Sequence, residues 1–244
     1  MTHSGDAAFS QNAPTLAQFE EAAAQLHDVI VRTPLEASQF LSDELGAPVH
    51  LKLENLQRTG SFKIRGAAYR LSKLTPEERA RGVVAASAGN HAQGVALAAQ
   101  ELGIPATIFM PLGVPVPKLL ATRGYGAEVV LEGPTVDTSL RLAAEFAERT
   151  GAVLIHPFDH ADVVAGQGTL GLEIVAKLPD VRTVVVCTGG GGLLAGVALA
   201  AKYALELRDV DPVVIDVVLD LADAGEAGAR ALRYAARDLL AECL

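Results

Sequence analysis

The feature that most constrains this fold is a regular alternation of short apolar segments with longer helical patterns, from residue 82 to residue 205. Short apolar runs bounded by Gly or Pro are typical of strands, and longer segments with apolar positions at helical spacing are typical of helices. The expected strands are 82–86, 106–110, 128–131, 153–156 and 183–188, and the expected helices are 90–102, 117–123, 135–149, 168–177 and 192–205. Strands that alternate with helices form parallel βαβ units, so the sequence predicts an α/β fold.

Two further elements are expected before this alternation begins. Thr15 followed by Gln18 is a capping-box pattern, which predicts a helix over residues 15–30. Further along, apolar and polar residues alternate from residue 49 to residue 54. This alternation predicts a strand whose buried face carries Val49, Leu51 and Leu53.

The composition excludes several classes of function. A net charge of −9 over 244 residues argues against nonspecific nucleic-acid binding, which depends on a basic surface. No apolar run reaches the roughly 18 residues of a membrane-spanning helix, and residues 1–12 lack the pattern of a secretory signal. Cys187 and Cys243 provide neither a disulfide framework nor a metal site, and Cys187 is expected to be a buried thiol in a strand. We therefore expect a cytoplasmic protein that does not bind membranes.

Lys63 lies in the stretch S-F-K-I-R-G-A (61–67), which opens a helical pattern after a turn that contains Gly60. A lysine in the first turn of a helix lies near the positive end of the helix dipole, which disfavours its charged form. If the amine also faces a dry pocket, it can be neutral near pH 7 and act as a nucleophile or a base. A lone lysine is more often an ordinary surface residue. The interpretation therefore depends on two further motifs.

The first of these is a run of four glycines, from Gly189 to Gly192, between a strand pattern and a helical pattern. Glycines allow consecutive backbone N–H groups to converge on an anion, and the N-terminus of the helix adds a favourable dipole. The run is not a Walker loop, because no G-K-[S/T] follows it, and it matches G-x-G-x-x-G only loosely through Gly196. The alternative is a flexible turn. Four consecutive glycines cost backbone entropy that a plain turn need not incur, but the residues alone leave phosphate binding and a flexible turn both open.

The second is S-A-G-N-H-A-Q-G (87–94), at the junction of an expected strand and an expected helix. Such a turn can present N–H groups to a carboxylate. Ser87 and Asn90 are alternatively helix N-caps, which is a common role for these residue types. His91 by itself is more often a turn histidine than a catalyst, so we assign it only to carboxylate binding.

These three motifs, in this order, resemble those of the threonine dehydratase and serine racemase family of pyridoxal-phosphate enzymes. R-T-P-L (32–35) and H-P-F-D (156–159) also fit, and the resemblance extends from about Thr15 to about Ala201. It implies fold type II, the tryptophan synthase beta-like fold: two three-layer α/β domains with mostly parallel sheets. The small domain would span 60–155. The large domain would combine 1–59 with 156–244 and be incomplete, because the family pattern is hard to follow after about Lys202.

The resemblance also implies roles for individual residues. Lys63 would be the catalytic residue, bonded to the aldehyde of pyridoxal 5'-phosphate and later taking the proton from the substrate Cα. The residues implied to bind the cofactor are Phe62 (near its ring), Lys63, Asn90 (at its phenolic oxygen), and Gly189, Gly190, Gly191, Gly192 and Leu193 (at its phosphate). The residues implied to bind the substrate carboxylate are Ser87, Ala88, Gly89 and His91.

The activity implied is the elimination of water and ammonia from a β-hydroxy amino acid. L-Threonine would give 2-oxobutanoate, or L-serine would give pyruvate, in a homo-oligomer (a dimer or a tetramer). Racemases that resemble this chain carry a serine at the position of Ala88, and alanine cannot exchange a proton, so elimination is favoured. The alternatives are a sibling serine racemase or hydroxyaspartate dehydratase, and an inactive truncated remnant that at most binds the cofactor.

The sequence departs from the family pattern near its C-terminus. Family members place a Ser or Cys at the pyridine nitrogen late in the chain, and no segment here matches that context, so Cys243 is not assigned. The family's divalent-cation ligands are not matched convincingly; Asp216 and Asp220 are no more than candidates, and the solvated or strand-end interpretation is preferred. We therefore predict no metal site. Residues 221–244 are expected to form an amphipathic helix.

Overall fold

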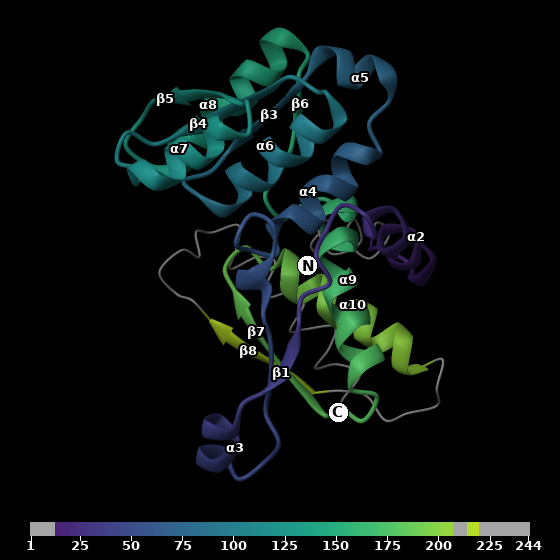
Figure 1. Ribbon diagram of the computed structural model, residues 1–244. Helices are drawn as coiled ribbons and strands as arrows, with labels where there is room; N and C mark the ends of the chain where they lie inside the picture. The colour runs from purple at the N-terminus through teal and green to yellow at the C-terminus, as the bar shows by residue number, and fades with distance from the viewer. Residues whose placement is uncertain (1–12, 207–213, 220–244) are drawn as a thin grey trace, which may run out of the picture.

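The structure is a computed structural model that describes residues 13–206 and, by their backbone, 214–219 (Figure 1). The upper part in Figure 1 is a parallel sheet with the strand order β5-β4-β3-β6. Its strands are β3 (Val83–Ala86), β4 (Ala106–Met110), β5 (Glu128–Leu131) and β6 (Val153–Leu154). The helices that connect them are α6 (Asn90–Leu102), α7 (Val116–Gly124) and α8 (Val136–Thr150). The predicted βαβ alternation is therefore present.

The two faces of this sheet are covered by different helices, because side chains alternate along a strand. Val83 and Ala85 of β3 pack in the core that contains α6. Val84 and Ala86 pack with Ala143 of α8 on the other face. The result is a helix–sheet–helix arrangement in which β3 is fully buried.

The lower part in Figure 1 is built around the helices α9 (Ala161–Lys177) and α10 (Gly192–Glu206), beside the parallel pair β7 (Thr183–Thr188) and β8 (Val214–Leu219). The helices α2 (Leu16–Leu26) and α4 (Lys63–Ser72) pack against α9. The remaining elements are β1 (Leu35–Ala37), α3 (Gln39–Leu45), β2 (His50–Lys52), η1 (Glu54–Leu56) and α5 (Pro76–Arg81). Among the described residues, no helix is long and apolar enough to cross a membrane.

Glycines allow α4, α9 and α10 to approach one another closely. A Cβ on Gly166 would lie 2.8 Å from the Cα of Gly66 in α4. A Cβ on Gly168 would lie 2.6 Å from the carbonyl oxygen of Gly196 in α10, and a Cβ on Gly196 would meet the backbone of Gly168. Since real Cβ atoms do not approach backbone so closely, these glycines fix how α4 and α10 pack on the two sides of α9.

These contacts explain why the predicted start of the helix at Gly168 was wrong. The structure begins α9 at Ala161, with His160 as its N-cap. Glycine inside a helical pattern lowers helix propensity, so the glycines at 166 and 168 weaken the local helix signal. Tertiary packing outweighs the low helix propensity of glycine here, because Gly166 and Gly168 are the positions at which α4 and α10 touch α9.

The predicted strand near residue 50 is present, but its predicted face was wrong. The strands β1 and β2 pair antiparallel, and Leu51 is exposed. The Lys52 side chain points inward instead, where its ammonium donates hydrogen bonds to the carbonyl of Thr33 (2.6 Å) and to Glu173 (2.5 Å). Buried charge pairing, which the sequence pattern does not reveal, therefore decides which face of β2 is covered.

Three smaller predictions can also be compared with the structure. The capping box of Thr15 and Gln18 is confirmed, but the helix ends at Leu26 rather than at residue 30. The strand predicted over 153–156 ends at Leu154. Cys187 is exposed, so its predicted burial was wrong, because one face of β7 packs against α9 and α10 while the other is left open by the described residues.

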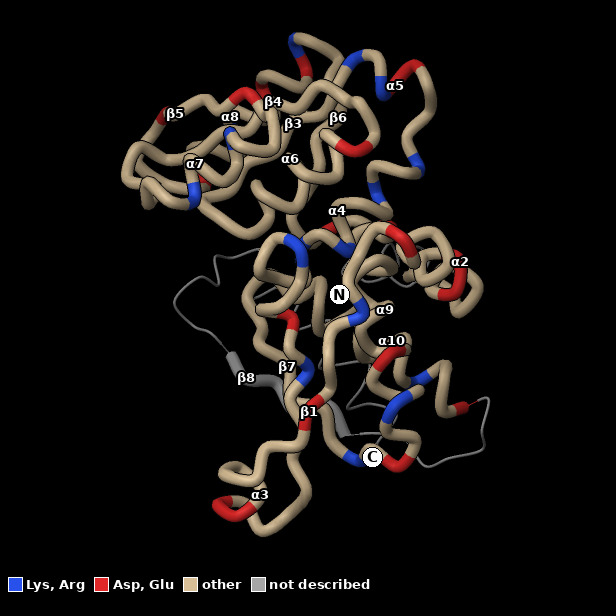
Figure 2. The backbone as a smooth tube through the Cα atoms, in the orientation of Figure 1, with Lys and Arg blue, Asp and Glu red and all other residues tan. Residues whose placement is uncertain are grey.

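Some predictions cannot be compared. Cys243, Asp220 and the helix expected over 221–244 lie outside the described residues, and of Asp216 only the backbone in β8 is described. The division of the chain at residues 60 and 156 stays a prediction. Figure 2 shows acidic and basic residues interspersed along the part of the chain that the structure describes.

Candidate active site

The strand order places two loops side by side at the carboxyl edge of the sheet. β3 pairs with β4 on one side and with β6 on the other, so the chain changes direction across the sheet between β3 and β6. In open α/β sheets, ligands bind outside the carboxyl ends of strands at such a switch point. The turn 87–91 follows β3, and the turn 155–159 follows β6. These two turns are therefore where a site is expected.

Lys63 is the first residue of α4, as the sequence predicts, and its side chain is partly buried. Its amine donates a hydrogen bond to the carbonyl oxygen of Pro157 (2.8 Å) and lies 5.2 Å from the centre of the Phe62 ring. Burial lowers the pKa of Lys63 to about 8, because the charged form loses hydration there. An appreciable fraction of the amine is therefore neutral near pH 7, as nucleophilic attack requires.

Close backbone contact brings α6 against the start of α4. A Cβ on Gly94 would lie 3.1 Å from the backbone N of Ile64 and from the carbonyl group of Lys63. Gly94 belongs to the motif that begins at Ser87. The glycine at the end of that motif is thus needed so that α6 can pack on the residue that carries the amine.

A buried ion network holds α4 from its other side. The fully buried Arg65 guanidinium forms hydrogen bonds with both carboxylate oxygens of Glu54 (2.8 Å each) and with Glu173 (2.7 Å). It also donates to the hydroxyl of Thr169 (3.1 Å). Burial alone would raise the pKa of Glu173, but hydrogen bonds from Arg65 and Lys52 lower it. A planar guanidinium shared between two carboxylates resists rotation, so this network fixes α4 relative to α9.

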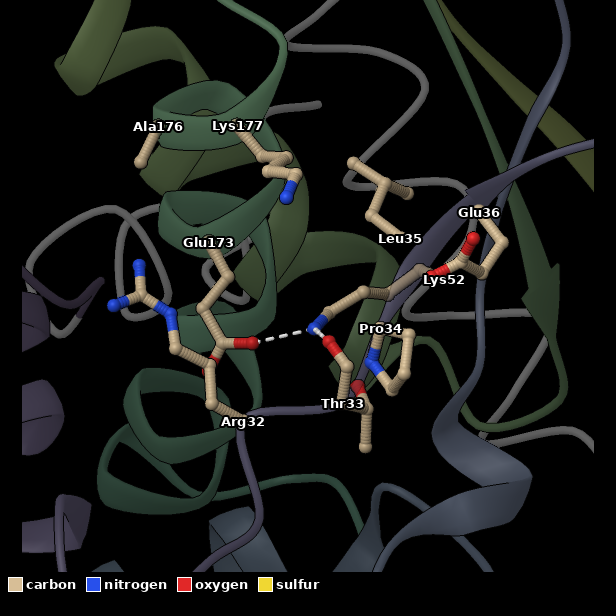
Figure 3. A pocket seen from close by; sticks show the side chains of 9 residues that line it. All are labelled: Arg32, Thr33, Pro34, Leu35, Glu36, Lys52, Glu173, Ala176 and Lys177. Carbon is tan, nitrogen blue, oxygen red and sulfur yellow. Dashed lines mark hydrogen bonds and ion pairs between the residues drawn. The ribbon is translucent and has the colours of Figure 1, made fainter.

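Glu173 of this network and its partner Lys52 line a cavity of about 400 Å³ (Figure 3). Figure 3 shows the Lys52 amine pointing to the Glu173 carboxylate inside this cavity. Its lining residues are Arg32, Thr33, Pro34, Leu35, Glu36, Lys52, Glu173, Ala176 and Lys177. None of the residues that the sequence predicts for the site lines this cavity, so it is separate from the predicted site.

The turn after β3 has free hydrogen-bond donors. The Ser87 hydroxyl accepts from the N–H of Gly89 (3.1 Å), but neither Asn90 nor His91 donates its backbone N–H to another described residue. The Asn90 side chain is exposed, and Ala88 is partly buried. The Lys118 side chain of α7 lies over this turn: a Cβ on Gly89 would be 2.8 Å from the Lys118 amine. A cation therefore adjoins the N-terminus of α6.

The His91 imidazole is buried and does not face this turn. Its Nε2 lies 2.9 Å from the carbonyl oxygen of Ile155, to which it donates a hydrogen bond, because a carbonyl can only accept. Burial, and then the nearby charge of Lys63, lower the pKa of His91 to about 3. The side chain is thus a neutral link between α6 and the turn after β6. Its predicted role in carboxylate binding rests on its backbone N–H.

The glycine quartet, Gly189 to Gly192, lies between β7 and α10. Among the described residues, no backbone N–H from Gly189 to Leu194 has an acceptor, and the first such bond runs from Ala195 to Gly191. Gly191 has a φ of 85°, which favours glycine. Unbonded donors at a helix N-terminus are what an anion requires.

Phe158 explains why two of the four glycines lack side chains. A Cβ on Gly190 would lie 2.1 Å from the Phe158 ring, and a Cβ on Gly192 would lie 2.8 Å from the Phe158 carbonyl oxygen. Nothing lies within 4 Å of such an atom on Gly189. Phe62 and Leu193, both predicted to bind the cofactor, pack against the same apolar cluster of β7, α9 and α10.

The structure thus brings together the predicted motifs. Lys63 contacts Pro157, His91 contacts Ile155, and the glycine quartet contacts Phe158, so the turn 155–159 touches all three. In the sequence, residues 156–159 stood out only as part of the resemblance, and nothing indicated that they contact all three motifs. Lys118 and the partners of Arg65 were not predicted either. Contacts across such sequence distances leave no local pattern that would have revealed them.

These residues fit both ends of pyridoxal phosphate. An amine with a lowered pKa suits the aldehyde, and the unbonded N–H groups of the glycine quartet suit the phosphate. The individual roles predicted for Phe62, Asn90 and the turn 87–91 stay predictions.

The chain is similar to several known proteins. The chain is 56% identical over 188 residues to the L-threonine ammonia-lyase of Thermotoga maritima, covering 77% of this chain and 47% of that protein. The solved threonine deaminase isoform 2 of Solanum lycopersicum, in its processed form, is 42% identical, with a TM-score of 0.78, and the match covers 85% of this chain and 61% of that one. The serine racemase of maize is 36% identical, with the same TM-score and the same coverage.

These neighbours confirm the predicted fold class. The chain spans about half the length of the curated relatives it matches. The family model described as "Pyridoxal-phosphate dependent enzyme" matches residues 26–237, which is most of the sequence. The chain therefore belongs to the family of pyridoxal-phosphate dependent enzymes.

Proposed function

We propose that this protein is a threonine ammonia-lyase that converts L-threonine to 2-oxobutanoate and ammonia, or L-serine to pyruvate and ammonia. The observation that carries the proposal is that one turn, the one after β6, contacts the Lys63 amine through Pro157 and the glycine quartet through Phe158. The names of relatives and neighbours, L-threonine ammonia-lyase and threonine deaminase, support the same activity.

Lys63 is the residue that takes the proton from the substrate Cα. Its pKa of about 8 allows the amine to accept a proton from the substrate Cα and to release it again near neutral pH. Pyridoxal phosphate, when bound, supplies the electron sink that makes this Cα–H bond acidic. The glycine quartet and the N-terminus of α10 bind its phosphate, and Phe62 and Leu193 contribute apolar contacts from the cluster on which they pack.

The turn 87–91 binds the substrate carboxylate. Its unbonded N–H groups at Asn90 and His91 lie at the N-terminus of α6, and the Lys118 amine beside Gly89 adds a positive charge. Asn90 additionally donates to the phenolic oxygen of the cofactor. Elimination removes the β-hydroxyl as water, and a water molecule is taken up again when ammonia is released, so the net change is loss of ammonia.

Serine racemisation is the second candidate, because the maize serine racemase has the same fold. Ala88 argues against it, since a methyl group cannot deliver a proton to the opposite face of Cα. Steady formation of D-serine from L-serine by the purified protein would favour the racemase over the lyase.

The proposal is tested by a paired assay on the 244-residue chain. Pyridoxal phosphate should give an absorbance near the edge of the visible range that borohydride bleaches and that Lys63→Ala abolishes. The loaded protein should then release 2-oxobutanoate from L-threonine. An adduct without oxo-acid release would identify a protein that binds the cofactor without this activity. No adduct at Lys63 would contradict the proposal.

We also propose, from the composition, that the protein works in the cytoplasm and, from the resemblance, that it is a homo-oligomer, a dimer or a tetramer. Size-exclusion chromatography with light scattering tests the assembly state.

A further inference from the structure

The turn formed by residues 156–159 contacts two predicted parts of the site at consecutive residues. The carbonyl of Pro157 accepts the hydrogen bond of the Lys63 amine at 2.8 Å. Phe158 packs its ring against Gly190 and its backbone against Gly192. A displacement of this turn would therefore move the acceptor of the amine and the support of the glycine quartet together.

The His156 imidazole holds this turn in place. Its Nδ1 accepts hydrogen bonds from the backbone N–H of Asp159 (2.8 Å) and, at 3.4 Å, from that of Phe158. The imidazole also packs edge-on against the Phe158 ring, with 4.7 Å between the ring centres and 87° between the planes. These contacts close a turn around Pro157, which itself has no N–H to donate.

The imidazole can accept only if Nδ1 carries no proton. Burial, and then the charge of Lys63, lower the pKa of His156 against the opposing effect of Asp159, which agrees with a neutral ring. The proton of the neutral ring is then on Nε2, which leaves Nδ1 as the acceptor.

We propose that His156 is a positioning residue, whose Nδ1 folds residues 156–159 so that Pro157 holds the Lys63 amine while Phe158 supports the glycine quartet. This proposal rests on the proposed function only for the identity of the phosphate ligand. The hydrogen bond between Pro157 and Lys63 does not depend on the proposed function. His156 acts through Pro157 and Phe158 and needs no contact with substrate.

The experiment compares His156→Leu with His156→Asn in the full chain. An Asn side-chain oxygen can accept from N–H groups two or three residues ahead, as in an Asx turn, whereas Leu cannot. His160→Leu is a matched control. His160 Nδ1 also accepts from a backbone N–H two residues ahead, that of Asp162 at 3.1 Å, but it caps α9 without contacting Lys63 or the glycine quartet.

The first readout is the affinity for pyridoxal phosphate and for pyridoxal, which lacks the phosphate. Loss of support for the glycine quartet should weaken the phosphate form by about ten-fold, the effect expected when hydrogen bonds that hold a binding loop are lost. Pyridoxal should be affected much less. His156→Asn should bind both compounds like the wild type. His160→Leu should keep the wild-type ratio of the affinity for pyridoxal phosphate to the affinity for pyridoxal.

The second readout needs no cofactor: the pH dependence with which acetic anhydride labels Lys63, followed by peptide mass spectrometry. A carbonyl acceptor favours the charged amine, so its displacement in His156→Leu should lower the labelling midpoint relative to the wild type. His156→Asn should restore the midpoint, and thermal unfolding checks that each variant is folded.

The outcomes separate this proposal from the proposed function. If wild-type protein forms no adduct with pyridoxal phosphate, the proposed function fails, while a lowered Lys63 midpoint in His156→Leu still supports the positioning role. If a folded His156→Leu protein keeps the wild-type midpoint and affinity ratio, or if His160→Leu reproduces its changes, the positioning role is wrong.

Discussion

The Lys63 amine donates a hydrogen bond to the carbonyl of Pro157, 94 positions further along the chain. This bond joins the start of α4 to the turn that follows β6. The amine is the group on which the proposed chemistry depends, so its local environment yields the most direct predictions.

Lys63 should be reactive at lower pH than an ordinary lysine. Because burial lowers its pKa to about 8, its labelling by acetic anhydride should rise with a midpoint near pH 8, measured by mass spectrometry. In urea the midpoint should return to the ordinary value of 10.5. The unfolded chain then binds the extra proton between pH 8 and 10.5, so this group makes stability rise with pH over that window. A folded-state midpoint near 10.5 would contradict the assignment.

Gly190→Ala should destabilise the protein, whereas Gly189→Ala should not. The new methyl group at residue 190 would overlap the Phe158 ring, an overpacking that typically costs about 1–3 kcal/mol of unfolding free energy. The methyl at residue 189 meets nothing within 4 Å, and its effect should stay within about 0.5 kcal/mol. Urea unfolding of both variants measures the difference. Equal costs would show that the quartet does not pack on Phe158.

Arg65→Met should cost about 3–5 kcal/mol of unfolding free energy, because it removes the buried guanidinium that pairs with both Glu54 and Glu173. The control is Arg141→Met, which removes the exposed pair with Glu145 and should cost less than about 0.5 kcal/mol. Urea unfolding at pH 7 compares the two. A small loss for Arg65→Met would mean that the network does not fix α4.

The same network predicts acid sensitivity. The pKa of Glu173 is lower in the folded protein than its ordinary value of 4.5. Its contribution to the free energy of unfolding is therefore complete above pH 4.5 and is lost as the pH falls through the lower, folded-state pKa. Glu173→Gln should reduce stability at pH 7 and should flatten this part of the pH dependence. Urea midpoints between pH 3 and pH 7 test this, and parallel curves for variant and wild type would contradict it.

His91 should remain neutral well below its ordinary pKa of 6.5. Its folded pKa of about 3 means that only the unfolded chain takes up this proton as pH falls from 6.5 to 3, so the group reduces stability over that window. Long-range ¹H–¹⁵N spectra at pH 5 should show a neutral ring with its proton on Nε2, which donates to Ile155. A ring that titrates near 6.5 would show that this bond is absent.

Lys118→Met should raise the KM for L-threonine by roughly three-fold and leave kcat unchanged, as expected when one exposed charge near a bound carboxylate is lost. Lys177→Met is the control, because Lys177 lines the separate cavity of Figure 3. Steady-state kinetics of the loaded protein measure both. An effect on kcat alone, or an equal effect of both variants, would remove Lys118 from the carboxylate site.

Local sequence patterns were enough to predict most of the helices and strands. Strand and helix periodicity located β3, β4, β5 and β7 and their helices to within a few residues, because these patterns are local. The first-turn position of Lys63 and the place of the glycine quartet before α10 also follow from neighbouring residues.

How these elements meet depends on tertiary contacts. The lysine motif, the turn 87–91 and the glycine quartet converge on residues 155–159, through bonds such as His91 to Ile155 that span 64 positions. The start of α9, the inward face of β2 and the exposure of Cys187 were wrong in the sequence-based prediction for the same reason. Helix contacts, buried ion pairs and strand coverage depend on residues far apart in the chain, and a local pattern holds no information about which distant residues become neighbours.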